Sequence, residues 1–141
     1  MYKTNFYMIT RYLLFLLFIV AVHIPAEAQV KNINITVRRA EDLNSKDAAP
    51  WPGVIVYGFF NASKANAFMK KCQEEEAKGM TYAPQSESEY DALAETDQDG
   101  YCLMQLPLTG YIVVKPSGSD PVKRELRGMM DIKVTCLAAK Q

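Results

Sequence analysis

The stretch Glu95-Thr-Asp-Gln-Asp-Gly-Tyr-Cys-Leu-Met-Gln-Leu-Pro-Leu-Thr-Gly-Tyr-Ile-Val-Val-Lys115 predicts β-strands joined by tight turns. Asp99-Gly100 is a strong hairpin-turn signal, because glycine adopts a positive φ without a Cβ clash. Residues 101–106 then alternate at strand period, and a second β-rich run covers 111–115 after a reversal that contains proline and glycine. This pattern is typical of neighbouring strands in a β-sandwich.

Residues 1–28 have the three parts of a secretory signal peptide. Lys3 and Arg11 make the amino end basic, an apolar run covers 13–24, and Ala26-Glu27-Ala28 is a small-x-small cleavage signal. The apolar run is shorter than the roughly 20 residues that a membrane-spanning helix needs, which favours a cleaved signal peptide. An uncleaved membrane anchor is the alternative interpretation. We therefore expect export to the periplasm, the cell envelope or the extracellular space. Residues 29–141 then form one domain with no stable membrane span.

The charge balance of residues 29–141 argues against nucleic acid and anionic membrane as partners. The chain has 16 basic and 16 acidic residues, and loss of Lys3, Arg11 and Glu27 with the signal leaves 14 and 15. A nearly neutral domain lacks the basic surface that such partners require. The single histidine, His23, lies within the predicted signal. Residues 29–141 thus contain neither the commonest general base nor the commonest metal ligand.

Four further runs predict strands. Residues 32–38 and 131–137 alternate apolar and polar side chains, as half-buried strands do. Residues 54–60 form a nearly continuous apolar run, rich in β-branched and aromatic side chains, that suits a buried strand. Residues 122–126 are a weaker candidate. We expect an all-β fold, a small β-sandwich of about seven strands.

A helical insertion is predicted over residues 62–94, between the second and third strands. Asn61 or Ser63 can cap a helix that runs to about Lys78, with Gly79 as its stop. Downstream, the capping box Ser86-Glu87-Ser88-Glu89 predicts a short second helix over 87–94.

The first of these helices has only a narrow apolar stripe, made by Phe68, Met69 and Cys72. We expect it to lie on a face or an edge of the sheet. Replacing residues 63–93 with a short Gly/Ser turn should then leave the sandwich folded and alter partner binding or self-association. The alternative is that the helix completes the core.

The segments Pro52 to Val56, Glu95 to Tyr101, Leu106-Pro107 and Tyr111 to Val114 resemble the carboxypeptidase-regulatory-like domains. In that family a Pro-Gly-Val strand is followed by a Thr-Asp-x-x-Gly segment and a strand that ends at Leu-Pro. The resemblance implies a prealbumin-like (transthyretin-like) β-sandwich, of the kind found in envelope proteins of Bacteroidota. It covers residues 33–60 and 94–138, and the helical insertion stands where that family has a short loop.

No cofactor or metal site is predicted. Glu95, Asp97 and Asp99 can be laid on a calcium-binding EF-hand loop, but position twelve is then Leu106, where a bidentate glutamate is required. The hairpin turn is the favoured interpretation of this segment. The acidic residues within 74–76 and 87–91 are interpreted as a solvated surface and not as paired catalytic carboxylates.

The cysteines of residues 29–141 are Cys72, Cys102 and Cys136, an odd number without a Cys-x-x-Cys motif. Cys102 and Cys136 are in phase with core-facing positions, so packing in the core is the first interpretation. A Cys102–Cys136 disulfide is the alternative, since an exported protein can form one.

These observations predict a non-enzymatic, exported interaction or accessory module of the bacterial cell envelope, whose partner is an envelope or outer-membrane protein. One alternative is a carbohydrate-binding module that uses Trp51 and Tyr82, because exposed aromatic rings stack on sugars or anchor partners. Trp51 can equally plug one end of the sandwich. A further alternative, a small hydrolase, resembles the hydroxyisourate hydrolases in the sandwich alone. Those enzymes use histidines that residues 29–141 lack.

Overall fold

The computed structural model of the chain describes residues 11, 29–42, 44 and 46–138. They form a mostly-β domain in which two four-stranded sheets enclose a common apolar core, which confirms the predicted β-sandwich. The predicted signal peptide lies outside the described residues, apart from Arg11. No helix in the described part of the chain is long and apolar enough to cross a membrane.

One sheet, called here the β1 sheet, is built around its central strand. β1 (Val30–Ala40) pairs in parallel with β8 (Asp131–Leu137) along one edge. Along its other edge it pairs antiparallel with β5 (Tyr101–Pro107) and with the two-residue β2 (Ala49–Pro50).

The second sheet, called the β3 sheet, is antiparallel throughout. Its strands lie in the order β4 (Ala92–Glu95), β3 (Ile55–Phe59), β6 (Tyr111–Lys115) and β7 (Val122–Glu125). The short strands β2 and β4 were not predicted, so the described residues contain eight strands where about seven were expected.

The main core lies between the two sheets. In β1, β5 and β8 every second side chain points at the β3 sheet, and the others face solvent. A sheet with one wet face is expected to alternate in this way. The nine side chains that this sheet contributes to the core are Ile33, Ile35, Val37, Cys102, Met104, Leu106, Ile132, Val134 and Cys136.

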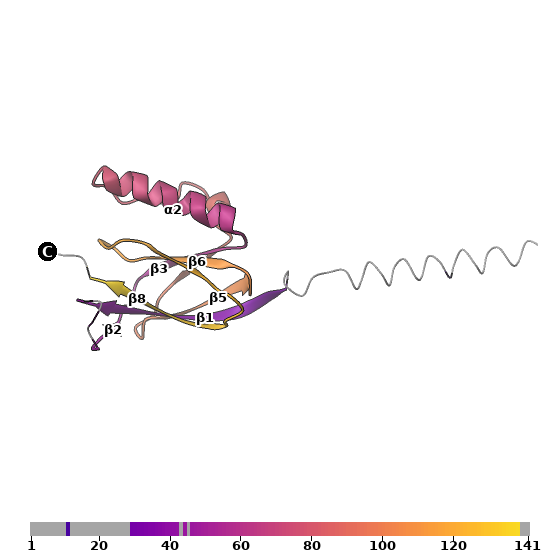
Figure 1. Cartoon of the computed structure of the whole chain (residues 1–141), viewed down its shortest axis with the longest axis horizontal. Coiled ribbons are helices and arrows are strands. Elements are labelled where there is room, and N and C mark those ends of the chain that lie inside the picture. Colours follow the sequence, from indigo (N-terminus) through magenta and orange to yellow (C-terminus); the bar gives the residue numbers. More distant parts are fainter. Residues whose placement is uncertain (1–10, 12–28, 43, 45, 139–141) are drawn as a thin grey trace, which may run out of the picture.

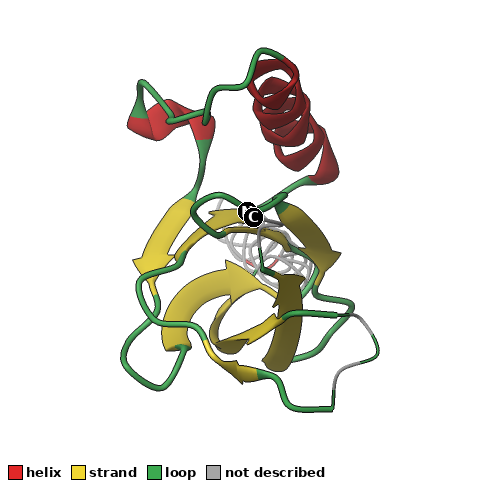
Figure 2. Ribbon diagram, turned by 90° about the vertical axis from the view of Figure 1, so that its left-hand side faces the viewer, coloured by secondary structure: helices red, strands yellow, loops and turns green. Residues whose placement is uncertain are grey.

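The two central strands of the β3 sheet, β3 and β6, are buried on both faces. Val56 packs between the sheets, whereas Tyr57 and Phe59 point outward and are covered by Phe68 of α2 (Ala62–Ala77). Figure 1 shows α2 lying over β3 and β6, and Figure 2 shows both helical segments on one side of the strands. A strand covered on both faces has no polar side, which explains the nearly continuous apolar run over 54–60.

The ends of α2 follow the predicted capping. The side chain of Asn61 accepts a hydrogen bond from the Lys64 N–H at 2.9 Å, so Asn61 and not Ser63 is the N-cap. Lys78 is the C-cap, and Gly79 follows it with φ +75°. The predicted helix is therefore confirmed to within one residue at its carboxyl end.

The predicted second helix over 87–94 is wrong. The capping box between Ser86 and Glu89 forms, but it supports only a single 3-10 turn, Glu87–Glu89. Ala92–Glu95 is strand β4, which pairs with β3 and packs Ala92 and Ala94 against the main core. Long-range strand pairing has overridden a local helix signal, and the helical insertion lies between β3 and β4.

The Thr-Asp segment after β4 has a structural role. Thr96 is 5% exposed, and its hydroxyl donates to the Trp51 carbonyl at 2.7 Å and accepts from the Val54 N–H at 2.8 Å. The Asp97 carboxylate accepts from two backbone N–H groups of the turn, at 2.9 and 3.0 Å. The motif thus ties the hairpin to the loop that precedes β3.

The three cysteines are free and buried. Cys102 and Cys136 lie on β5 and β8, which flank β1 on opposite edges. Two strand spacings alone separate them by about 10 Å, and their partners on β1, Ile35 and Arg39, add an offset of four residues along the strand. Bridged cysteines have Cα atoms within about 7 Å. The topology therefore favours core packing over a Cys102–Cys136 disulfide.

Candidate binding groove

A groove of about 290 Å³ opens between the carboxyl end of α2 and the connection from β6 to β7. One wall comes from the helical insertion and the other from a turn between two strands of the β3 sheet. The residues that line it are Glu76, Gly79, Met80, Thr81, Lys115, Pro116, Gly118, Ser119 and Asp120. The two walls lie far apart in the sequence, so the groove forms only when the chain is folded.

Lys115 is the cationic group of the groove. Its Nζ lies 5.5 Å from the centroid of the Tyr82 ring, and no carboxylate of the described residues lies within 4.0 Å of it. Burial lowers the pKa of this amine, and the nearby Cys72 and Glu76 side chains act in the opposite direction. An amine held beside a ring and partly withdrawn from water keeps donor capacity for a ligand.

Ser119 carries the one buried side-chain oxygen or nitrogen that lacks a hydrogen-bond partner among the described residues. Its backbone N–H donates to the Pro116 carbonyl at 3.4 Å, so the turn is closed while the hydroxyl stays unpaired. A buried unpaired hydroxyl costs roughly 1–3 kcal/mol. Such a group at a groove is poised to bond a bound molecule.

The remaining charged lining is acidic. Glu76 and Asp120 contribute carboxylates, and no ion pair in the described residues involves either one. Glu75 is by contrast bridged to Lys78 at 3.7 Å. A carboxylate in the last turn of α2 opposes the helix dipole, so Glu76 adds nothing favourable to the helix itself.

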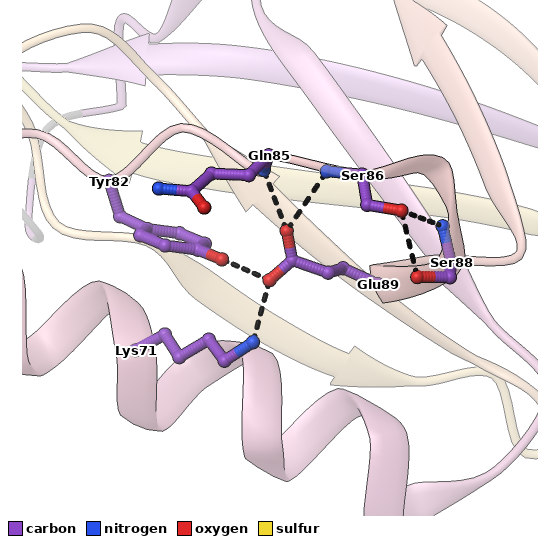
Figure 3. Close-up of polar contacts among 6 residues, drawn as sticks. All are labelled: Lys71, Tyr82, Gln85, Ser86, Ser88 and Glu89. Atoms are coloured by element: carbon purple, nitrogen blue, oxygen red, sulfur yellow. Dashed lines mark hydrogen bonds and ion pairs between the residues drawn. The ribbon is translucent and has the colours of Figure 1, made fainter.

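A hydrogen-bonded cluster, here called the clasp, fixes the insertion wall of the groove (Figure 3). Glu89 accepts from the Lys71 Nζ at 2.7 Å, from the Tyr82 hydroxyl and from the Gln85 N–H at 2.7 Å. Its side chain is 14% exposed. The hydrogen bonds from Lys71 and then Tyr82 lower the pKa of Glu89 to about 2.

Tyr82 connects the clasp to the groove. Its ring meets Phe68 edge-on at 5.7 Å between centroids, and the Lys115 amine lies over the same ring. Burial and the hydrogen bond to Glu89 raise the pKa of Tyr82, so the hydroxyl remains a donor at neutral pH. The clasp therefore fixes Tyr82 against the outer face of the β3 sheet, next to the residues that line the groove.

Trp51 and Tyr82, the two predicted binding residues, do not form one site. Trp51 packs against the core between the sheets, with the Arg39 guanidinium over its ring at 5.4 Å. Tyr82 belongs to the separate cluster beneath α2. Both rings are engaged by protein groups, and the position of Trp51 matches the interpretation as a plug of the sandwich.

Lys115 and Ser119 were missed by sequence reasoning. The pattern over 111–115 predicts Lys115 only as the last residue of a strand, and no motif marks Ser119. A lysine at the end of an apolar strand is the one signal in the sequence, and it does not reveal which segment packs opposite that lysine. That information comes from the helical insertion.

The buried thiols offer no nucleophile. Burial raises the pKa of Cys102 and of Cys136 to about 11, and burial also raises the pKa of Cys72. A thiol in that state is protonated at neutral pH and is inert.

Solved structures with a similar arrangement of strands include bacterial pilins. Shaft pilin SpaA from Lactobacillus rhamnosus GG matches with a TM-score of 0.43 and 12% identity, over 79% of this chain and 52% of that one. Its N-terminal domain alone matches with a TM-score of 0.42 and 12% identity, over 79% and 96%. The minor pilin GBS52 from Streptococcus agalactiae has a TM-score of 0.40 and 13% identity, over 80% and 46%.

The chain thus spans about half the length of the shaft pilin chain, and a likeness at this level carries no inference about function. No model of a known protein family matches the chain, and no curated protein matches it. Membership of the carboxypeptidase-regulatory-like domains therefore stays a prediction.

Proposed function

We propose that the chain is an exported, non-enzymatic accessory module of the bacterial cell envelope that binds a partner protein in the groove beside α2. The observation that carries this proposal is a preformed groove whose polar groups are unpaired, namely Glu76, Asp120 and the Ser119 hydroxyl. The predicted signal peptide and the resemblance to envelope domains support export and the envelope.

The chemistry of the groove selects a segment with a cationic side chain. Glu76 and Asp120 provide carboxylates for a lysine or arginine of the partner. Ser119 and Lys115 can bond backbone carbonyls of the same segment, and Met80, which is 53% exposed, offers an apolar contact. An acidic, half-apolar groove of this kind suits a basic peptide segment better than a sugar or an anion.

The absence of enzymatic activity is part of the proposal. Residues 29–141 contain no histidine, and the one carboxylate with a strongly shifted pKa, Glu89, is consumed by the clasp. The thiols are held in the cores. These groups stabilise the fold and are not presented to a substrate.

Glu76→Lys tests the groove as a docking surface. Immobilised protein is exposed to solubilised envelope of the source bacterium, and the bound partner is quantified. Glu76→Lys should abolish binding, while the fold persists because a lysine near the carboxyl end of a helix is favourable. The matched control is Glu87→Lys, an exposed glutamate outside the groove, which should bind normally. Equal retention by both variants would contradict the proposal.

Ser119→Ala separates binding from stability. Removing a buried hydroxyl that has no partner should leave the free energy of unfolding unchanged or raise it. Partner binding should nevertheless weaken, because one hydrogen bond in the groove is lost. A variant that loses stability and keeps binding would assign the hydroxyl a purely structural role.

A further inference from the structure

The strand edges of the two sheets differ in how they are protected against pairing with other chains. β2 has two residues and ends in Pro50, and β4 has four residues and contacts β5 at the corner between the sheets. β7 also has four residues, of which three in succession are charged, and its Lys123 is bonded to Asn66 of α2. Short length, proline, charge and coverage are the devices that protect edges.

β8 has the fewest of these protections. It is seven residues long, contains no proline, and pairs with β1 alone in the described part of the chain. Its two charged side chains, Asp131 and Lys133, are separated by a core residue, and both stand on the outer face of the sheet. β5 has the same length and also pairs with β1 alone, but it contacts β4 at the corner between the sheets and ends in Pro107. This leaves β8 as the long strand with the less protected outer edge.

The hydrogen-bonding groups on that edge can be assigned from the register. The Asn34 N–H donates to the Met130 carbonyl at 2.7 Å, and the Ala138 N–H donates to the Ala40 carbonyl at 2.8 Å. Because backbone groups alternate along a strand, the even-numbered residues of β8 bond to β1. The N–H and C=O groups of Asp131, Lys133, Thr135 and Leu137 then point away from the sheet.

We propose that two copies of this chain pair antiparallel through β8, so that the two β1 sheets become one continuous sheet across a two-fold axis at Val134. Four outward residues on each copy give about eight backbone hydrogen bonds in this register. A two-fold contact consumes the open edge of both copies, so assembly stops at a dimer.

The side chains of β8 suit a second copy in this register. Lys133 of one copy lies opposite Thr135 of the other, and Asp131 lies opposite Leu137, so no like charges face each other directly. The exposed apolar residues Met130 and Leu137 stand at opposite ends of the strand, 45% and 40% exposed. Antiparallel pairing brings Met130 of each copy to the same end as Leu137 of the other.

This inference concerns the edge of the β1 sheet and does not rest on the proposed function, whose groove belongs to α2 and the β6–β7 connection. The first test is sedimentation equilibrium of the purified protein over a wide range of concentration. A mass that rises from monomer to dimer and no further is expected. A monomeric mass up to the solubility limit, or growth beyond a dimer, would overturn the proposal.

Two substitutions at Thr135 should change the affinity of the dimer in opposite directions and so test the register. Thr135→Glu places a carboxylate opposite Lys133 of the second copy, twice by symmetry, and should tighten the dimer about 2- to 30-fold. Thr135→Lys places like charges there and should weaken it by a similar factor. Thermal unfolding of the two variants at low concentration controls for effects on the monomer through Arg38, the neighbour of Thr135 on β1. Equal dimer affinity in both variants would refute this register.

Amide hydrogen exchange supplies an internal control. The N–H groups of Lys133 and Thr135 should become protected as the concentration rises, whereas that of Val134, which bonds to β1, should be protected throughout. A dimer in which Lys133 and Thr135 exchange as fast as in the monomer would place the contact elsewhere and overturn the proposal.

Discussion

Gly100 closes the turn between β4 and β5 at a position that no other residue fits well. Its φ is +73°, and a Cβ atom built there lies 2.5 Å from the Val37 carbonyl oxygen and 2.9 Å from the Trp51 nitrogen. That carbonyl and that nitrogen are hydrogen-bonded to each other at 3.0 Å, so neither can move away freely. The Asp-Gly signal thus reports both a turn and a close approach of three backbone segments.

Gly100→Ala and Gly79→Ala form a matched pair. Both glycines have nearly the same φ, +73° and +75°, but nothing lies within 4 Å of a Cβ at Gly79. We expect Gly79→Ala to cost about 1–2 kcal/mol through the backbone alone. Gly100→Ala should cost more, because the contact with the Val37 carbonyl is added. Urea unfolding measures both, and equal losses would show that the close approach carries no strain.

The clasp and α2 act together at the scale of elements. Lys64 of α2 is paired with Asp91 at 2.7 Å, and Lys71 of the same helix is paired with Glu89 at 2.7 Å. These two pairs join the helix to the segment that returns to β4. α2, which has only a narrow apolar stripe, is therefore held both by its buried face and by these ion pairs on its polar side.

Acid should weaken the clasp in a defined range of pH. The pKa of Glu89 is about 2 in the folded chain against an ordinary value of 4.5. A lowered pKa stabilises the fold above about pH 4.5, and the contribution is lost as the pH falls toward 2. As the pH falls from 4.5 to 2, the free energy of unfolding of the Glu89→Gln variant should therefore decrease less than that of the unmodified chain. Urea unfolding midpoints at several pH values measure this difference. Glu87→Gln is the control and should behave like the unmodified chain.

Phe68→Ala tests whether α2 completes a core. Phe68 is 2% exposed and stacks on Tyr57 and Phe59, so its loss should cost about 3–5 kcal/mol. Phe60→Ala, at a side chain that is 48% exposed, should change stability by less than about 0.5 kcal/mol. A small effect of Phe68→Ala would support the expectation that residues 63–93 can be replaced without loss of the fold. The burial of Phe68 supports the alternative, in which the helix is part of the core.

At the scale of the whole molecule, the described residues form three layers: α2, the β3 sheet and the β1 sheet (Figure 2). The central strands of the middle layer, β3 and β6, are apolar on both faces, whereas the β1 sheet is apolar on one face only. Each of the two interfaces encloses its own apolar cluster, and Cys102 and Cys136 belong to one while Cys72 belongs to the other. The fold therefore separates its cysteines.

Thiol titration checks this separation. Denatured, unreduced protein should show three free thiols, because the strand order keeps Cys102 and Cys136 apart and Cys72 lies on the far side of the β3 sheet. The folded protein should react slowly, since all three side chains are buried. A single free thiol after denaturation would establish a bridge and would contradict the strand order.

The sequence by itself determined most of the strands, the main helix and the Asp-Gly turn. These features depend on neighbours within a few residues: the period of 101–106, the cap at Asn61, the glycines at 79 and 100. Sequence reasoning failed at Ala92–Glu95, where a capping box predicts helix and pairing with β3 enforces a strand. Local signals cannot register a partner strand more than thirty residues away in the chain.

Only the tertiary structure decided which surfaces are available. The separation of Trp51 from Tyr82, the groove between α2 and Ser119, and the open edge of β8 all depend on contacts between distant segments. A residue's type states what it can bond, but its neighbours across the fold decide whether that capacity is already used. Glu89 and Glu76 are both glutamates of the insertion: the fold commits the first to the clasp and leaves the second without an ion pair, facing the groove.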